Sequence, residues 1–116
     1  MSGLIEAGKK SNVPQGGMME IKIEGLDILL ANVDGNIYAI NNKCPHMGGN
    51  LAKGKLEGTV VTCPLHGSQF DVTNGKVIRW LKGSNLLSAI GKAFKSPAEV
   101  KSYSVKLDGD TIFIKL

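Results

Sequence analysis

The chain has 116 residues, of which 42% are hydrophobic and 21% charged, and its formal net charge is +4. A chain of this length can build its own hydrophobic core, and we expect residues 1–116 to form a single domain. No Lys- and Arg-rich run with interleaved aromatics occurs, and no apolar stretch approaches about 20 residues, which argues against nucleic-acid binding and a membrane span. The N-terminal segment lacks an apolar run long enough for a signal peptide, so we expect a cytoplasmic protein.

The first half of the chain predicts three antiparallel strands. Residues 19–24 alternate, with Met19, Ile21 and Ile23 on one face. A second run covers residues 27–33, and the turn formed by Asp34 and Gly35 leads into a third run. Alternating runs joined by such turns are typical of a β meander.

The second half continues the pattern with shorter runs. A β-branched run over 58–63 leads directly to a cysteine. Runs at 69–72 and 76–80 flank a turn at 73–75, and runs at 101–107 and 111–116 flank a turn at 108–110. The chain is therefore predicted to be all-β, with an antiparallel sandwich or small barrel as its architecture.

One stretch departs from this pattern. Between residues 83 and 97, Leu87, Ile90 and Phe94 recur at helical spacing, and Pro97 ends the run. These features predict one short helix near 84–96. We expect this helix to pack on the domain, with partner docking and membrane contact as the alternatives.

All the cysteines and histidines lie in two short motifs. Cys44 and His46 form a C-x-H motif, and Cys63 and His66 form a C-x-x-H motif. A reducing compartment favours metal binding or catalysis over a disulfide for two lone cysteines. Each motif can present a thiolate and an imidazole to one centre, so the spacing indicates a metal site. By spacing alone, mononuclear zinc and an iron–sulfur cluster are both possible.

The complete pattern, C-P-H, sixteen residues and C-P-L-H-G-S, resembles the signature of Rieske [2Fe–2S] proteins. The resemblance implies a Rieske-type β framework with a small cluster-binding subdomain and cluster-binding loops at 43–50 and 62–71. It further implies one [2Fe–2S] cluster per chain, with Cys44 and Cys63 on one iron and His46 and His66 on the other. The residues expected to surround these ligands are Met47, Gly48, Leu65, Gly67, Ser68 and Phe70.

The same resemblance bears on the reduction potential. Rieske proteins of respiratory complexes carry an extra disulfide-bonded cysteine in each loop, where this chain has Gly49 and Leu65. They also carry two hydroxyls after the second ligand pair, of which this chain keeps Ser68 but has Phe70 in place of the tyrosine. Fewer donors to sulfur lower the potential. We therefore expect a value near the low end of the Rieske range, about −150 to +300 mV.

The function implied by the resemblance is electron transfer without catalysis. The chain would be a soluble ferredoxin that passes single electrons from a reductase to a terminal oxygenase or other redox enzyme. The ferredoxin component of an aromatic-ring dioxygenase system is one setting, and 116 residues leave no room for the mononuclear-iron domain of the oxygenase itself. The Rieske-like small subunit of a nitrite reductase is an alternative. A structural zinc module with the same four ligands is another, and a visible absorption spectrum would distinguish it.

Overall fold

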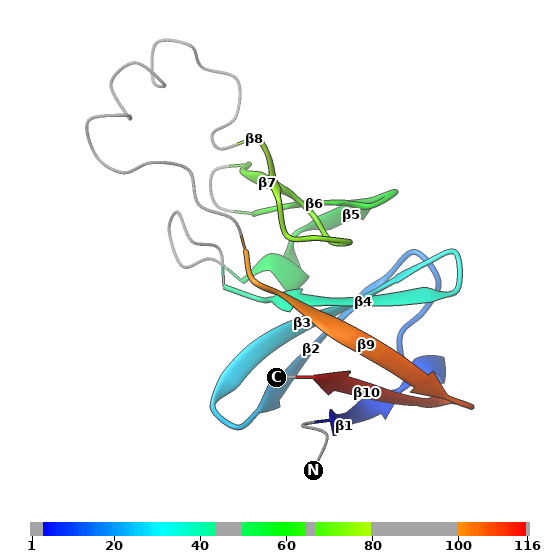
Figure 1. Cartoon of the computed structure of the whole chain (residues 1–116). Helices are drawn as coiled ribbons and strands as arrows, with labels where there is room; N and C mark the ends of the chain where they lie inside the picture. The colour runs from blue at the N-terminus through cyan, green and yellow to red at the C-terminus, as the bar shows by residue number, and fades with distance from the viewer. Residues whose placement is uncertain (1–3, 44–49, 65–66, 80–99, 116) are drawn as a thin grey trace, which may run out of the picture.

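The computed structural model describes residues 4–43, 50–64, 67–79 and 100–115. In these ranges the strands form two antiparallel sheets, a six-stranded sheet in the order β1-β10-β9-β4-β3-β2 and a four-stranded sheet in the order β5-β6-β7-β8 (Figure 1). The all-β prediction is confirmed. The predicted helix near 84–96 lies outside the described residues.

The described strands divide between the large sheet, with six, and the small sheet, with four. The large sheet comprises β1 (Leu4–Lys9), β2 (Met18–Ile23), β3 (Leu26–Val33), β4 (Asn36–Asn41), β9 (Ser102–Asp108) and β10 (Thr111–Lys115). The small sheet comprises β5 (Lys55–Glu57), β6 (Val60–Thr62), β7 (Gln69–Asp71) and β8 (Val77–Arg79). Two 3₁₀ turns, η1 (Lys10–Asn12) and η2 (Leu51–Lys53), complete the described elements.

The predicted meander β2–β3–β4 is confirmed, and two-residue turns join its strands, of which the sequence predicted the Asp34–Gly35 turn. Glu24 and Gly25 form the first turn with φ values of 51° and 81°, and Asp34 and Gly35 form the second with 54° and 87°. Positive φ at both central residues is the signature of hairpin turns whose twist matches that of the flanking strands. These turns set the register, which pairs Ile21 with Ile28 and Leu30 with Ala39.

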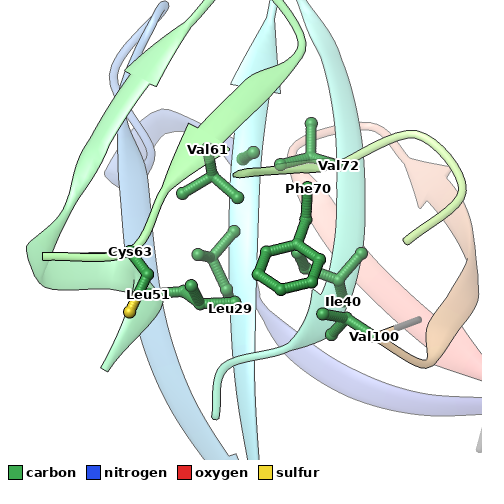
Figure 2. Close-up of a cluster of buried hydrophobic side chains, with 9 residues drawn as sticks. Leu29, Ile40, Leu51, Val61, Cys63, Phe70, Val72 and Val100 are labelled. Atoms are coloured by element: carbon green, nitrogen blue, oxygen red, sulfur yellow. The ribbon is translucent and has the colours of Figure 1, made fainter. Parts of the chain in front are cut away.

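Strand β3 is buried on both faces, which explains its unbroken apolar run. Ile28 and Leu30 face the interior of the nearly closed large sheet, and Leu29 and Ala31 face the small sheet. Successive side chains of a strand point to opposite faces, so each face of β3 serves a different core. The core inside the large sheet also contains Val13, Ile37, Ala39, Tyr103, Ile112 and Ile114. The core between the sheets also contains Ile40, Leu51, Val61, Cys63, Phe70, Val72 and Val100 (Figure 2).

Two strands were not predicted. β1 pairs with β10, from Leu4 opposite Lys115 to Lys9 opposite Thr111, with a register shift before Gly8. β5 has three residues and pairs with β6, where Lys55 lies opposite Thr62. Neither segment has a clear period-2 pattern, because a bulge interrupts the first and the second is too short. Each of these strands forms because it pairs with another strand, which is distant in the sequence for β1 and neighbouring for β5. The local sequence pattern does not show such pairing.

The small sheet is an insertion in the large one. The chain leaves the large sheet after Asn41 and re-enters it at Ser102, and these two points are adjacent: Ile40 pairs with Ser102, and the Asn41 N–H donates to the Lys101 carbonyl at 2.8 Å. Residues 42–101, which hold all four predicted ligands, therefore begin and end at one place on the large sheet. Across the described ranges, no helix has the length and apolarity needed to cross a membrane.

Candidate iron–sulfur centre

The second cluster loop begins at the end of β6 and contains a closed turn. The Cys63 N–H donates to the Ser68 carbonyl at 2.7 Å, and the Gly67 N–H donates to the Cys63 carbonyl at 3.1 Å. Gly67 has φ 75°, a left-handed conformation that glycine adopts without strain. The loop therefore starts and ends at a pair of hydrogen-bonded residues, which holds Cys63 at its base.

The side chain of Cys63 belongs to the core between the sheets. It is 2% exposed, and its sulfur points away from Val61, Val72 and Phe70 (Figure 2). A thiol at the edge of an apolar cluster has one side packed and one side available for a ligand. This placement suits a cysteine that binds a metal centre shielded from water.

Three residues predicted to surround the ligands lie in this part of the described chain. Gly67 occupies the turn described above. Ser68 is fully buried, and its backbone closes the loop. Phe70 is fully buried too, and its ring packs against Leu29, Ile40 and Val100 (Figure 2). Its packing in the core between the sheets shows a structural role for Phe70 that the sequence did not predict.

The first cluster loop is closed at its base by Asn42. An isolated bridge pairs Lys43 with Asn50, and the Leu51 N–H donates to the Asn42 carbonyl at 2.9 Å. The Asn42 side chain is fully buried. Its amide donates to Asn50 Oδ1 at 2.9 Å, and its Oδ1 accepts from the Ala52 N–H at 2.8 Å. One asparagine thus ties together the residues before and after positions 44–49.

This polar network continues to the large sheet. The Asn42 amide also lies 3.3 Å from Asp27 Oδ1, and the Asn50 amide donates to Glu20 Oε1 at 3.1 Å. The hydrogen bond from Asn50 is the main cause that holds the pKa of the Glu20 carboxyl below its ordinary value. Lys22 lies 3.7 Å from Glu20 and 3.8 Å from Asp27. The base of the first loop is therefore fastened to β2 and β3 by charged and amide groups.

Sequence reasoning missed Asn42 and Asn50, although one signal was available. Asn42 follows Ile40 by two residues, which places it on the face that packs against the small sheet, where an apolar residue is expected. A polar residue at such a position must have hydrogen-bond partners. The identity of those partners depends on the returning chain and cannot be read from the strand itself.

The structure brings the bases of both loops to one place. Leu51, which follows the first loop, and Cys63, which begins the second, are members of the same apolar cluster. Gly54 lies against the backbone of Thr62, the residue before Cys63. The other predicted ligands, Cys44, His46 and His66, and the neighbours Met47, Gly48 and Leu65 lie outside the described residues. Among the described residues no group of three or more His, Cys, Asp or Glu could hold a metal ion.

Comparison with known proteins agrees with this geometry. The Rieske [2Fe–2S] domain model matches residues 3–104. The ferredoxin component of the naphthalene 1,2-dioxygenase/salicylate 5-hydroxylase systems of a Ralstonia species is 32% identical over 112 residues, covering 97% of this chain and 94% of that protein. The ferredoxin of carbazole 1,9a-dioxygenase from Nocardioides aromaticivorans IC177 has the same fold, with a TM-score of 0.80, 22% identity and 98% coverage of both chains. A chain in a complex of reduced oxygenase and oxidised ferredoxin in carbazole 1,9a-dioxygenase has a TM-score of 0.77 and 19% identity, covering 99% of this chain and 94% of that one.

The chain belongs to the Rieske [2Fe–2S] domain family. Within that family it is of the ferredoxin kind, an electron carrier with one Rieske-type [2Fe–2S] cluster. The buried thiol of Cys63, the hydrogen-bonded turn that follows it and the adjacent base of the first loop fit such a cluster. The sequence-based assignment of family, fold and cofactor is confirmed.

Proposed function

We propose that residues 1–116 form one cluster-binding domain in which Cys44 and His46 from loop 43–50, and Cys63 and His66 from loop 62–71, hold the cluster. The two thiolates would bind one iron and the two imidazoles the other. The observation that carries this proposal is the joining of both loop bases to one apolar cluster, through Leu51 and Cys63. When bound, a Rieske cluster accepts and gives up one electron at a time.

The chain's own residues hold the two loops in register and keep water from one side of the centre. Asn42 fixes the ends of the first loop, and the Cys63–Ser68 hydrogen bond fixes the second. Leu51, Val61 and Phe70 fill the space beneath them. Because these residues are fixed and partly exclude water, the protein and solvent around the cluster rearrange less when the charge of the cluster changes.

The setting that we propose is a multicomponent aromatic-ring dioxygenase system. A reductase would be the electron donor and a terminal oxygenase the acceptor, and both would meet this protein in the cytoplasm. The relatives named as ferredoxin components of dioxygenase systems match it over nearly their whole length and support this setting.

Two measurements test the proposal. The purified protein should contain about two irons and two acid-labile sulfides per chain, show a visible absorption spectrum, and take up one electron in a titration. With the reductase and terminal oxygenase of a naphthalene dioxygenase system, oxygenase turnover should require this chain. Protein that binds one zinc and is colourless would overturn the proposed cluster. Coloured protein that the reductase cannot reduce would overturn the proposed setting.

A further inference from the structure

The charges of this chain are distributed unevenly between its two sheets. The inserted part, residues 42–101, contains nine Lys and Arg and three Asp and Glu, a net charge of +6. The rest of the chain contains five Lys and Arg and seven Asp and Glu, a net charge of −2. Within the described residues alone, the inserted part contains six Lys and Arg and two Asp and Glu, so the molecule is dipolar and its inserted part is positive. Such an asymmetry produces a field that acts on charged partners as they approach.

Four of these positive charges lie next to the described ends of the two loops. Lys43 is the first residue of the first loop and pairs with Asn50, its last residue, and Lys53 follows that loop in η2. Lys55 lies opposite Thr62, which precedes Cys63. Lys101 lies beside the exit of β4, and its ammonium sits 5.2 Å from the Tyr103 ring centroid. We call Lys43, Lys53, Lys55 and Lys101 the basic rim, and all four are exposed.

A row of residues across the small sheet shows how close the rim comes to the second loop. Lys55, Thr62, Gln69 and Arg79 are paired in that order from β5 to β8. The Gln69 amide lies 3.2 Å from Thr62 Oγ1, which links the two central strands. Thr62 and Gln69 flank Cys63 and Ser68 in the sequence. This row is therefore the edge of the small sheet at which the second loop begins and ends, and the exposed Lys55 lies at one end of it.

The acidic residues near this edge are largely engaged. Glu20 and Asp27 are hydrogen-bonded to Asn50 and Asn42 and share Lys22 as a counter-ion. Glu57 lies 3.8 Å from Lys55, with both side chains exposed, so that pair is weak. Among the described residues, Glu24 in the β2–β3 turn is a further exposed acid on this side of the large sheet. These four carboxylates keep their charge when they accept hydrogen bonds, but the basic rim together with Lys22 supplies five positive charges against four negative ones, so the field next to the loops is positive.

We propose that the basic rim is a docking surface for an acidic protein, so that this carrier recognises redox partners whose electron-transfer face is rich in Asp and Glu. The inference rests on the proposed function, because the rim lies at the described ends of the loops assigned to the cluster. Electron transfer requires the partner to approach those loops, and a positive rim attracts a negative face at that point. A partner with a basic electron-transfer face would be repelled by the rim, which would lower both the association rate and the affinity.

The test uses small redox reagents of opposite charge in place of the unidentified partner. Protein reduced with dithionite is mixed in stopped flow with hexacyanoferrate(III), a trianion, or hexaamminecobalt(III), a trication. Oxidation by the anion should slow at least tenfold between about 0.01 and 0.5 M ionic strength, and oxidation by the cation should accelerate. Protein that cannot be reduced at all would count against the proposed function. Reduced protein that shows the reverse salt dependence would overturn the docking surface alone.

Matched variants separate the rim from the net charge. K53Q/K55Q removes two rim charges, and K9Q/K106Q removes two exposed charges at the far end of the large sheet. At about 0.01 M, K53Q/K55Q should react with the anion at least about fivefold more slowly than the unmodified protein, as a unit charge roughly 10 Å from a trianion predicts. K9Q/K106Q should leave the rate unchanged. Equal slowing by both pairs would show that net charge acts alone and would overturn the proposal.

A control with nucleic acid completes the test. A basic surface can also attract phosphate backbones, so the protein should be titrated with duplex DNA at about 0.15 M salt. We expect no retarded complex in a mobility-shift experiment. A specific complex that K53Q/K55Q abolishes would assign the rim to nucleic acid and overturn the proposed protein partner.

Discussion

Replacing Asn42 with alanine should lower the stability of the fold. It should also make the cluster dissociate faster than this loss of stability alone explains. The substitution removes two donated hydrogen bonds, to Asn50 and Asp27, and the acceptor of the Ala52 N–H. Leaving a buried polar group unpaired costs about 1–3 kcal/mol. The loss of these bonds, together with a small cavity, predicts about 3–4 kcal/mol of lost stability. That is a large part of the roughly 5–15 kcal/mol of an ordinary domain.

The chain supplies a matched control in Asn32. This asparagine is also buried, and its side chain donates to the Val13 carbonyl and accepts from the Gly35 N–H, each at 2.9 Å. It lies at the opposite end of β3 from the loops. Asn32→Ala should lose about 2–3 kcal/mol in urea denaturation, yet it should keep iron as the unmodified protein does.

The assay is the decay of visible absorbance after a chelator is added to the folded protein in the absence of denaturant. Asn42→Ala should lose its colour several times faster than Asn32→Ala, because it frees both ends of the first loop. The reasoning is refuted if the two variants, compared at equal stability by adjusting the temperature, lose iron at the same rate. In that case the Asn42 network would stabilise the fold without positioning the loop.

Three further predictions concern the small sheet, the proposed ligands and the large-sheet core. Gly75 has φ 77°, and a Cβ there would clash with the Val100 carbonyl oxygen, whereas Gly58 has φ 62° and open space around it. In urea denaturation Gly58→Ala should cost about 1 kcal/mol, and Gly75→Ala should cost at least about 3 kcal/mol; equal losses would show that the clash is relieved. Cys63→Ser should yield colourless, iron-poor protein by metal analysis, and a full complement of iron would contradict its role as a ligand. Burial raises the pKa of Tyr103, so the neutral phenol stabilises the fold below about pH 10, and that contribution is lost as the pH rises through the folded-state pKa. Tyr103→Phe should flatten this alkaline decline in thermal melts.

The prediction from sequence succeeded where a local pattern carries the information. The β2–β3–β4 meander and the β9–β10 hairpin have alternating side chains and turn residues, so their existence and order could be predicted. The spacing of Cys63 and His66 is likewise a local pattern, and the metal motif that it indicates stays a prediction. β1 could not, because its pairing with β10 joins residues more than 100 positions apart. The role of Phe70 was also missed, since its burial between the sheets depends on Leu29 and Ile40 from another part of the chain.

The insertion of residues 42–101 between two adjacent strands has a consequence for chain entropy. Pairing β4 with β9 closes a loop of 60 residues, which costs roughly 3.5 kcal/mol beyond the constant term for loop closure. The described pairing at that point comprises two residue pairs, Ala39 with Tyr103 and Ile40 with Ser102. Two residue pairs contribute too little free energy to offset this cost of loop closure on their own. The apolar contacts between the sheets shorten the effective loop, because Val72 and Val100 are held against β3 and β4. The small sheet thus lowers the entropic cost of completing the large one, and the large sheet in return holds together the two ends of the segment from which the small sheet is made.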